Sequence, residues 1–195
     1  MSVRKATVQR KTNETQITCT LVLDGTGQVN VSTGIGFLDH MLHALAKHAR
    51  FDLDLTCQGD LHVDDHHTAE DSALVIGQAI DEALGDRKGI ERFGDAHAPL
   101  DEALARAVVD LSGRPSAIVN LGLDRDMIGT ISTEMLSHVL VSLAMASRMT
   151  LHVDVLRGDN NHHKCESAYK AVARALRSAV RITGQDIPST KGTLG

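Results

Sequence analysis

The sequence is poor in aromatic residues, which make up 2% of its 195 residues and include no tryptophan. Single-stranded nucleic acid is usually bound on stacked aromatic side chains, so this shortage argues against that function. The formal net charge of −5 also disfavours a general nucleic-acid binder. With 42% hydrophobic residues, the chain can still bury a core, which we expect to consist mainly of leucine, isoleucine, valine and alanine.

Long apolar segments and paired cysteines are also missing. No segment approaches the roughly 20 apolar residues of a transmembrane helix, and the N-terminal residues 1–16 have no apolar region typical of a secretion signal. The three cysteines, Cys19, Cys57 and Cys165, show no paired spacing. Their odd number favours reduced thiols over a disulfide framework. We therefore expect a cytoplasmic protein with no membrane partner.

Histidine, by contrast, is abundant and clustered. The chain has 11 histidines, and two short segments each carry a His-His pair followed by a glutamate. The segments are HVDDHHTAED at 62–71 and DNNHHKCES at 159–167, so the two copies lie about half a chain length apart. Such a duplicated cluster indicates an internal repeat.

Other segments support the repeat. FLDHMLHALAKHARFDLDL at 37–55 resembles MLSHVLVSLAMASRMTLHV at 135–153, with an offset of 98 residues. Upstream, residues 8–25 resemble residues 108–124 in pattern, with an offset of 100. The offset then falls to 96 at the two histidine clusters, as small deletions in turns would produce.

These patterns predict an α+β fold with an internally duplicated lobe of strand, strand, helix, strand and helix. We expect two four-stranded sheets with the helices packed between them, related by a pseudo-twofold axis. Helices are predicted over 66–84 and 162–182, and the glycines and proline of 86–100 indicate a junction. The half-repeats 1–90 and 91–195 should together form one structural unit.

The clusters have the geometry of metal ligands. In each, the first histidine and the glutamate are four residues apart and share one helix face, whereas the second histidine points elsewhere. If the pseudo-twofold axis brings the two helix starts together, each second histidine can complete the other lobe's site. His40 and His138, which superpose in the repeat, are then the natural fourth donors. The predicted sites are His66, Glu70, His138 and His163 around one ion, and His40, His67, His162 and Glu166 around the other.

Three imidazoles and one carboxylate suit manganese, iron, cobalt, nickel or zinc, and leave open positions on a six-coordinate ion. Asp64 and Asp65, and Asn160 and Asn161 at the matching places, are candidates for orienting the imidazoles. Two alternatives remain open: a purely structural metal site, and a helix start that carries acidic residues without any metal.

Four segments, TGIGFLDHMLHALAKH, DLHVDDHHTAED, NNHHKCESAYKAVARAL and PSTKG, together resemble the imidazoleglycerol-phosphate dehydratase family of histidine biosynthesis. The likeness covers nearly the whole chain. It implies a hydro-lyase that converts D-erythro-imidazole glycerol phosphate to imidazole acetol phosphate, through a substrate imidazolate bound to two manganese ions per active site. It also implies a homo-oligomer, a twenty-four-subunit shell with active sites at subunit contacts. The chain that supplies each ligand stays open.

The resemblance also implies roles for single residues. Glu14 matches the family's acidic residue near the reacting carbon, and Glu166 and His67 join it as catalytic candidates. Because the 100-residue offset places Glu14 opposite Arg114, we expect one asymmetric pocket with acid–base chemistry at one end and phosphate at the other. The PSTKG segment by itself has the composition of a small anion-binding loop. The substrate-binding candidates are Glu14, His40, His48, Arg92, Arg114, Lys170, Ser189 and Lys191.

Two other functions fit the same residues. A metal-dependent hydrolase of a small phosphorylated substrate would use the ions to activate water. A metal-storage or structural-metal oligomer would bind ions without turnover, and would not need the phosphate-binding set.

Overall fold

The computed structural model describes residues 3–194, which form two similar lobes. The first lobe comprises β1 (Lys5–Lys11), β2 (Thr15–Val22), β3 (Val29–Ser32), α1 (Gly36–Ala49), β4 (Asp52–Gly59) and α2 (His66–Leu84). The second comprises β5 (Phe93–Leu100), β6 (Ala103–Asp110), β7 (Ser116–Asn120), β8 (Met127–Ile128), β9 (Ile131–Ser132), α3 (Thr133–Ala146), β10 (Thr150–Arg157) and α4 (Asn161–Ala179). The predicted junction between residues 90 and 91 falls between α2 and β5.

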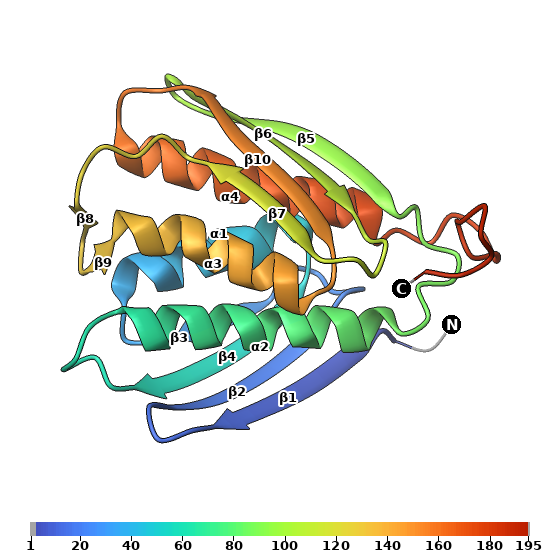
Figure 1. The fold of residues 1–195 in the computed structure, drawn as a ribbon, viewed down its shortest axis with the longest axis horizontal. Coiled ribbons are helices and arrows are strands. Elements are labelled where there is room, and N and C mark those ends of the chain that lie inside the picture. The colour runs from blue at the N-terminus through green and yellow to red at the C-terminus, as the bar shows by residue number, and fades with distance from the viewer. Residues whose placement is uncertain (1–2, 195) are drawn as a thin grey trace.

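Each lobe contributes one four-stranded sheet to an outer layer of the molecule, and the helices lie between the two sheets (Figure 1). The strand orders are β1-β2-β4-β3 and β5-β6-β10-β7. In each sheet the fourth strand in this order runs parallel to its neighbour, while the other pairs are antiparallel. The two sheets thus share one topology, and the predicted fold class is confirmed.

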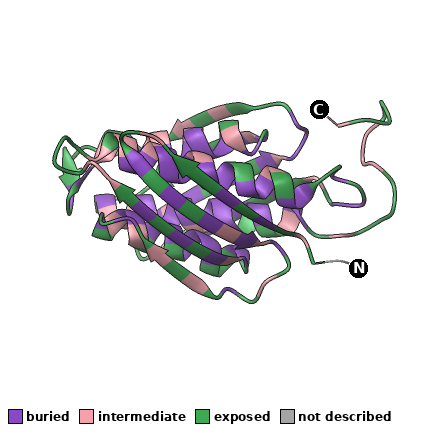
Figure 2. Cartoon of the chain, turned by 90° about the horizontal axis from the view of Figure 1, so that it is seen from below, coloured by how far each residue is buried: buried purple, intermediate pink, exposed green. Residues whose placement is uncertain are grey.

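Burial alternates along the strands because each sheet has one face toward the helices and one toward solvent (Figure 2). In β2, for example, Ile17, Cys19 and Leu21 are buried, and the core is largely aliphatic as expected. Its largest fully buried side chain is Tyr169 of α4, whose hydroxyl donates a 2.9 Å hydrogen bond to the carbonyl of Leu136 in α3. None of the described helices is long and apolar enough to cross a membrane.

The helices of one lobe pack on those of the other: α1 contacts α4, and α2 contacts α3. These cross-lobe contacts bury the apolar stripe that each helix turns away from its own sheet. The two halves therefore share a single core, and side chains from opposite ends of the sequence meet between the paired helices.

The strand registers define how the lobes correspond. Leu21 pairs with Leu53 in the first sheet, and Val109 pairs with Leu151 in the second. Val109 lies 88 positions after Leu21, whereas Leu151 lies 98 positions after Leu53. Ten extra residues therefore precede α3, in the stretch that contains the β8–β9 hairpin.

This register corrects one sequence-based alignment. The predicted match of residues 8–25 with 108–124 is wrong, because β1 and β2 correspond to β5 and β6. At the correct offset of 88, Glu14 corresponds to Glu102 and not to Arg114. Both glutamates lie in the turn between the first two strands of their lobe.

The predicted junction at 86–100 is also partly wrong, since β5 occupies Phe93–Leu100. Each four-stranded sheet has one strand more than the predicted repeat unit, and the second lobe also contains the β8–β9 hairpin. The small residues that resembled a loop are required by packing: α4 lies so close to β5 that a Cβ on Gly94 would collide with the backbone of Ala175. The helix predicted over 66–84 has those bounds in the structure, and the one predicted over 162–182 ends earlier, at Ala179.

Candidate metal centre

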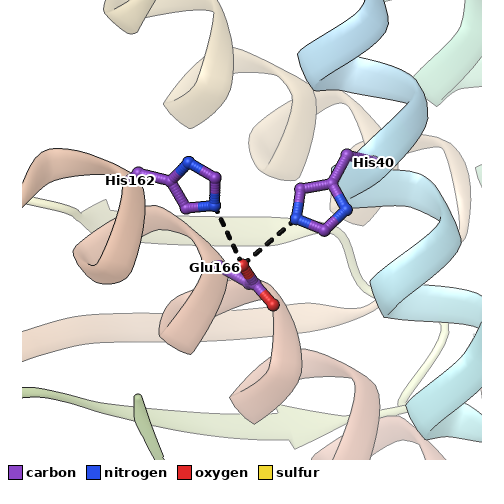
Figure 3. Close-up of side chains that lie close together, drawn as sticks. All are labelled: His40, His162 and Glu166. Atoms are coloured by element: carbon purple, nitrogen blue, oxygen red, sulfur yellow. Dashed lines mark hydrogen bonds and ion pairs between the residues drawn. The ribbon is translucent and has the colours of Figure 1, made fainter. Parts of the chain in front are cut away.

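The packing of α1 on α4 forms the first cluster. The Nε2 atoms of His40 and His162 each lie 3.1 Å from Oε2 of Glu166, and both rings point toward that carboxylate (Figure 3). Phe37 packs edge-on against the ring of His162, with 4.9 Å between centroids. The cluster is therefore built from one residue of the first lobe and two of the second.

The packing of α2 on α3 forms a second cluster of the same composition. Nε2 of His138 lies 2.9 Å from Oε1 of Glu70, and Nε2 of His66 lies 3.6 Å from the other carboxylate oxygen. Here the first lobe supplies two residues and the second lobe one. The pseudo-twofold symmetry thus produces two equivalent clusters, and neither lobe can form one alone.

Both clusters fit a transition-metal ion. In each, the three ligand atoms lie within 4.8 Å of one another. Ligand atoms about 2.0–2.2 Å from one ion lie roughly 3–4 Å apart, so small shifts of these side chains would suffice to bind one. Two imidazoles and a carboxylate provide the mixed nitrogen and oxygen donors that manganese, iron or zinc accept. Three of the four ligands predicted for each site therefore come together.

The fourth predicted ligands, His67 and His163, do not join the clusters. Nδ1 of His67 lies 3.0 Å from Asp60, and its Nε2 lies 3.7 Å from Oε1 of Glu14. Nδ1 of His163 lies 2.8 Å from Glu102. The expectation that each second histidine completes the other lobe's site within one chain is wrong, because each ring is held by a carboxylate of its own lobe, outside both clusters.

The carboxylates beside these two imidazoles also set their charge. A hydrogen bond to Asp60 raises the pKa of His67, and one to Glu102 raises the pKa of His163. The pKa of Glu102 itself is lowered to about 2, chiefly by the backbone N–H of Asn160 and then by His163. Glu102 is therefore ionised at neutral pH.

Asp60 and Glu102 were missed by sequence analysis, which expected Asp64, Asp65, Asn160 and Asn161 to orient the imidazoles. Asp64 and Asn160 instead hold the backbone at the starts of α2 and α4, while Asp65 and Asn161 contact segments outside these two helices. Asp64 accepts the N–H of His66, and Asp65 accepts the N–H of Ser132. Asn160 accepts the N–H of His162, and the side-chain amide of Asn161 donates to the carboxylate of Asp124. Glu102 lies 61 residues before His163, a separation that no local motif reveals.

Lys170, predicted to bind phosphate, contacts the first cluster. Its Nζ lies 2.7 Å from Oε1 of Glu166, one helical turn away. Burial opposes ionisation of Glu166, but the hydrogen bonds from Lys170 and His40 outweigh it and lower the pKa to about 2. His48 lies on the exposed side of α1, where partial desolvation by its neighbours, followed by the charge of Lys170, lowers its pKa. His40, His48 and Lys170 thus belong to one region.

The remaining phosphate candidates lie elsewhere. Arg92 donates to Asp110 at 2.7 and 3.1 Å and to the carbonyl of Pro188 at 2.8 Å, so it anchors the C-terminal tail that carries Ser189 and Lys191. Arg114, in the turn between β6 and β7, is exposed. The tail and this turn lie at the end of the molecule opposite the starts of α2 and α4 (Figure 1). Of the phosphate candidates, Lys170 contacts a metal cluster of its own chain, whereas Arg114 and the tail lie far from both clusters.

The fold and clusters define a duplicated α+β protein with two symmetry-related candidate metal sites. Residues 33–176 match the imidazoleglycerol-phosphate dehydratase family, and the chain belongs to this family.

Relatives of that name support the assignment. One from Eremothecium gossypii is 54% identical, with 98% of each chain covered, and one from Saccharomyces cerevisiae is 52% identical over both full lengths. One from Phytophthora nicotianae is 58% identical, but the chain spans only 43% of its length.

Solved structures agree. The imidazoleglycerol-phosphate dehydratase of Staphylococcus aureus superposes with a TM-score of 0.83 at 37% identity, covering 92% of this chain and 99% of that one. The Pyrococcus furiosus enzyme gives the same TM-score at 34% identity, covering 96% of this chain and 100% of that one. The predicted family and enzyme class, a hydro-lyase of histidine biosynthesis, are thus confirmed.

Proposed function

We propose that the chain dehydrates D-erythro-imidazole glycerol phosphate to imidazole acetol phosphate at a site holding two manganese ions, with the substrate's imidazole bound as an imidazolate. The observation that carries this proposal is the pair of equivalent clusters, His40, His162 and Glu166, and His66, Glu70 and His138, whose ligand atoms lie within 4.8 Å of one another. Each cluster would hold one ion, which gives the two ions that the proposed reaction requires.

The donor atoms support manganese among the candidate metals. The clusters combine imidazole nitrogen with hard carboxylate oxygen and contain no thiolate, since the three cysteines are buried in the core. When bound, the manganese ions supply Lewis-acid stabilisation of the negatively charged substrate ring. Glu70 and Glu166 contribute the anionic oxygen ligands, and the low pKa of Glu166 keeps it ionised well below neutral pH.

Glu14 is proposed to move the proton at the reacting carbon. Its side chain is 52% exposed, and its carboxylate faces Nε2 of His67 across 3.7 Å, so it lies next to a proposed metal ligand and stays open to a substrate. A carboxylate in that position can take a proton from carbon and deliver one to the departing hydroxyl. His67 and Glu166 would support this chemistry as ligands of the ions.

The phosphate is proposed to bind at the other end of the substrate, through Lys170, Arg114, Ser189 and Lys191, with His40 and His48 nearby. Arg92 supports this set by anchoring the tail through Pro188. Because the tail and the clusters lie at opposite ends of one chain (Figure 1), these residues meet only if chains associate.

We therefore propose a homo-oligomer, a twenty-four-subunit shell in which the tail of one subunit lies against the metal clusters of another. His67 and His163, which join neither cluster of their own chain, would complete the metal sites across these contacts. Closed symmetry would repeat such a contact for every subunit. We also place the protein in the cytoplasm, where its three unpaired thiols would stay reduced.

The decisive experiment incubates the manganese-loaded protein with imidazole glycerol phosphate and measures both the ketone product and inorganic phosphate. Ketone formation without phosphate release is expected. Release of phosphate would favour the metal-dependent hydrolase instead. Binding of manganese without either product would overturn the proposed reaction and leave a metal-storage role.

A further inference from the structure

The second histidine of each cluster makes the same contact in both lobes. Nδ1 of His67 lies 3.0 Å from the nearer oxygen of Asp60, and Nδ1 of His163 lies 2.8 Å from Oε2 of Glu102. Among the described residues, no carboxylate oxygen lies within hydrogen-bond distance of the Nε2 atoms of these rings: the nearest ion-pair partners are Glu14 at 3.7 Å and Asp101 at 3.9 Å.

This contact selects one form of the imidazole ring. An ionised carboxylate can only accept hydrogen bonds, so Nδ1 has to carry the proton. In the neutral ring the lone pair is then on Nε2, the atom that faces away from the carboxylate. Histidine ligands of metals commonly have their second nitrogen held by a carboxylate in this way.

The two lobes achieve the contact with different residues. Glu102 corresponds in the repeat to Glu14, at the offset of 88. A bulge in β10 makes Arg157 the equivalent of Gln58. Both Gln58 and Arg157 are followed by Gly-Asp, so Asp60 corresponds to Asp159.

Each lobe therefore carries an aspartate after the strand that precedes its last helix and a glutamate in its first hairpin turn. The two lobes differ in which of these carboxylates contacts the histidine. In the first lobe, Asp60 holds His67. In the second lobe, Glu102 holds His163 and also accepts the backbone N–H groups of Asp159 and Asn160. A contact that is kept while the carboxylate residue accepting it changes points to a requirement on the histidine itself.

We propose that Asp60 and Glu102 are positioning residues, which hold His67 and His163 with Nε2 directed outward to complete metal sites shared with neighbouring copies of the chain. This inference rests on the proposed function. It also explains why only one of the two repeat-related glutamates is available for proton transfer: Glu102 is bound to a ring and two backbone groups, whereas Asp60 frees Glu14 from that task.

The test compares Asp60→Ala and Glu102→Ala with the wild-type protein in titrations with manganese, in which free ion is counted by electron paramagnetic resonance. Asp54→Ala is the matched control, since Asp54 accepts a side-chain hydrogen bond from Asn30 on the outer face of the first sheet. Wild type and control should bind two ions tightly per chain. Each test variant should keep one tight ion and bind the other about 10- to 100-fold more weakly.

Conservative variants separate positioning from folding. Asp60→Asn and Glu102→Gln keep an oxygen that can accept the Nδ1 proton, so they should recover most of the lost affinity. Melting temperatures without metal show whether an alanine variant has lost its fold. Glu102→Ala removes two backbone hydrogen bonds as well, and Asp60→Ala, which lacks that complication, decides the matter.

The possible failures are distinguishable. If the wild type binds two ions and forms the ketone while Asp60→Ala and Glu102→Ala bind manganese equally well, the positioning role is overturned and the proposed function stands. Loss of both ions together with a lowered melting temperature in the metal-free Asp60→Ala protein would make Asp60 a residue of the fold, which also overturns the inference. A wild type without manganese binding would instead overturn the proposed function.

Discussion

Oε1 of Glu14 lies 3.7 Å from Nε2 of His67, across the gap between the β1–β2 turn and the start of α2. The turn is firmly held: Thr12 accepts the N–H of Glu14 at 3.1 Å, and the Thr15 hydroxyl donates to the buried carboxylate of Asp71 at 2.5 Å. The backbone of Glu14 is therefore fixed while its carboxylate stays exposed. This is the arrangement expected of a group that exchanges protons with a bound substrate.

Glu14→Gln should lose turnover and keep its metal. The amide has nearly the shape of the carboxylate but cannot accept a proton, and general acid–base groups contribute about 10²- to 10⁴-fold to rates. Turnover of imidazole glycerol phosphate and manganese content should be measured on the same preparation. Glu82→Gln is the control, because Glu82 is exposed on α2 and bonded to Gln78. Full activity in the Glu14 variant would exclude Glu14 from the reaction.

Thr15→Val should destabilise the protein, because it leaves the buried carboxylate of Asp71 without its hydroxyl partner. Among the described side chains, Asp71 would keep the ion pair with Arg10, at 3.1 Å. Hydrogen bonds to charged groups contribute about 1.5–3 kcal/mol, so the free energy of unfolding in urea should fall by roughly that amount. Thr7→Val, which alters an exposed threonine pair on the outer face of the sheet, should change it little. If Thr15→Val and Thr7→Val changed the free energy of unfolding equally, the buried contact between Thr15 and Asp71 would make no specific contribution to stability.

The metal clusters were the most predictable part of the molecule, because the spacing of His162 and Glu166 fixes their common helix face whatever the tertiary structure. His40 and His138 were found through the repeat, whose offset of 98 is confirmed by the strand register. Glu102 was not found, because the ten extra residues in the second lobe make the true offset of the first strands 88. The sequence alignment used an offset of 100 there and so paired Glu14 with Arg114. Similarly, the small residues of β5 resembled those of a loop. The structure shows that α4 packs so closely on β5 that Gly94 leaves no room for a side chain. Local periodicity is visible in the sequence, whereas insertions and helix–strand distances are not.

Glu70→Gln and Glu166→Gln should each lose one of two manganese ions, since each removes the anionic ligand of one cluster. Elemental analysis after gel filtration gives the stoichiometry. Retention of two ions in both variants would show that the clusters are not the binding sites.

Complete removal of metal by a chelator should also dissociate the proposed shell. If His67 and His163 complete sites on neighbouring subunits, bound ions cross-link the chains, and removing them takes away that link. Light scattering should then report a smaller particle, and re-addition of manganese should restore the original mass. A metal-free particle of unchanged mass would show that the ions do not hold the subunits together.

All three thiols should be unreactive in the native protein at pH 8. Burial raises the pKa of Cys19 to about 12, and it raises the pKa values of Cys57 and Cys165 as well. The thiolate is the reactive form, so a raised pKa lowers its population at pH 8 below that of an exposed cysteine, while burial blocks the reagent. A colorimetric thiol assay should count none before unfolding and three in urea. Rapid native labelling of any one thiol would contradict the burial.

Lys191→Met and Arg92→Met should have different effects, because among the described residues the side chain of Arg92 has hydrogen-bond partners and the side chain of Lys191 has none. Lys191→Met removes one charge-assisted hydrogen bond to the substrate phosphate, so KM for the phosphorylated substrate should rise by roughly 10-fold. Because Lys191 is exposed on the tail, kcat and the melting temperature should change little. Arg92→Met also removes the contacts to Asp110 and Pro188, and should lower the melting temperature as well as raise KM. Lys5→Met, on the exposed face of β1, should alter neither quantity. An unchanged KM in the Lys191 variant would remove Lys191 from the phosphate site, and a melting temperature unaffected by Arg92→Met would show that the tail is held by other contacts.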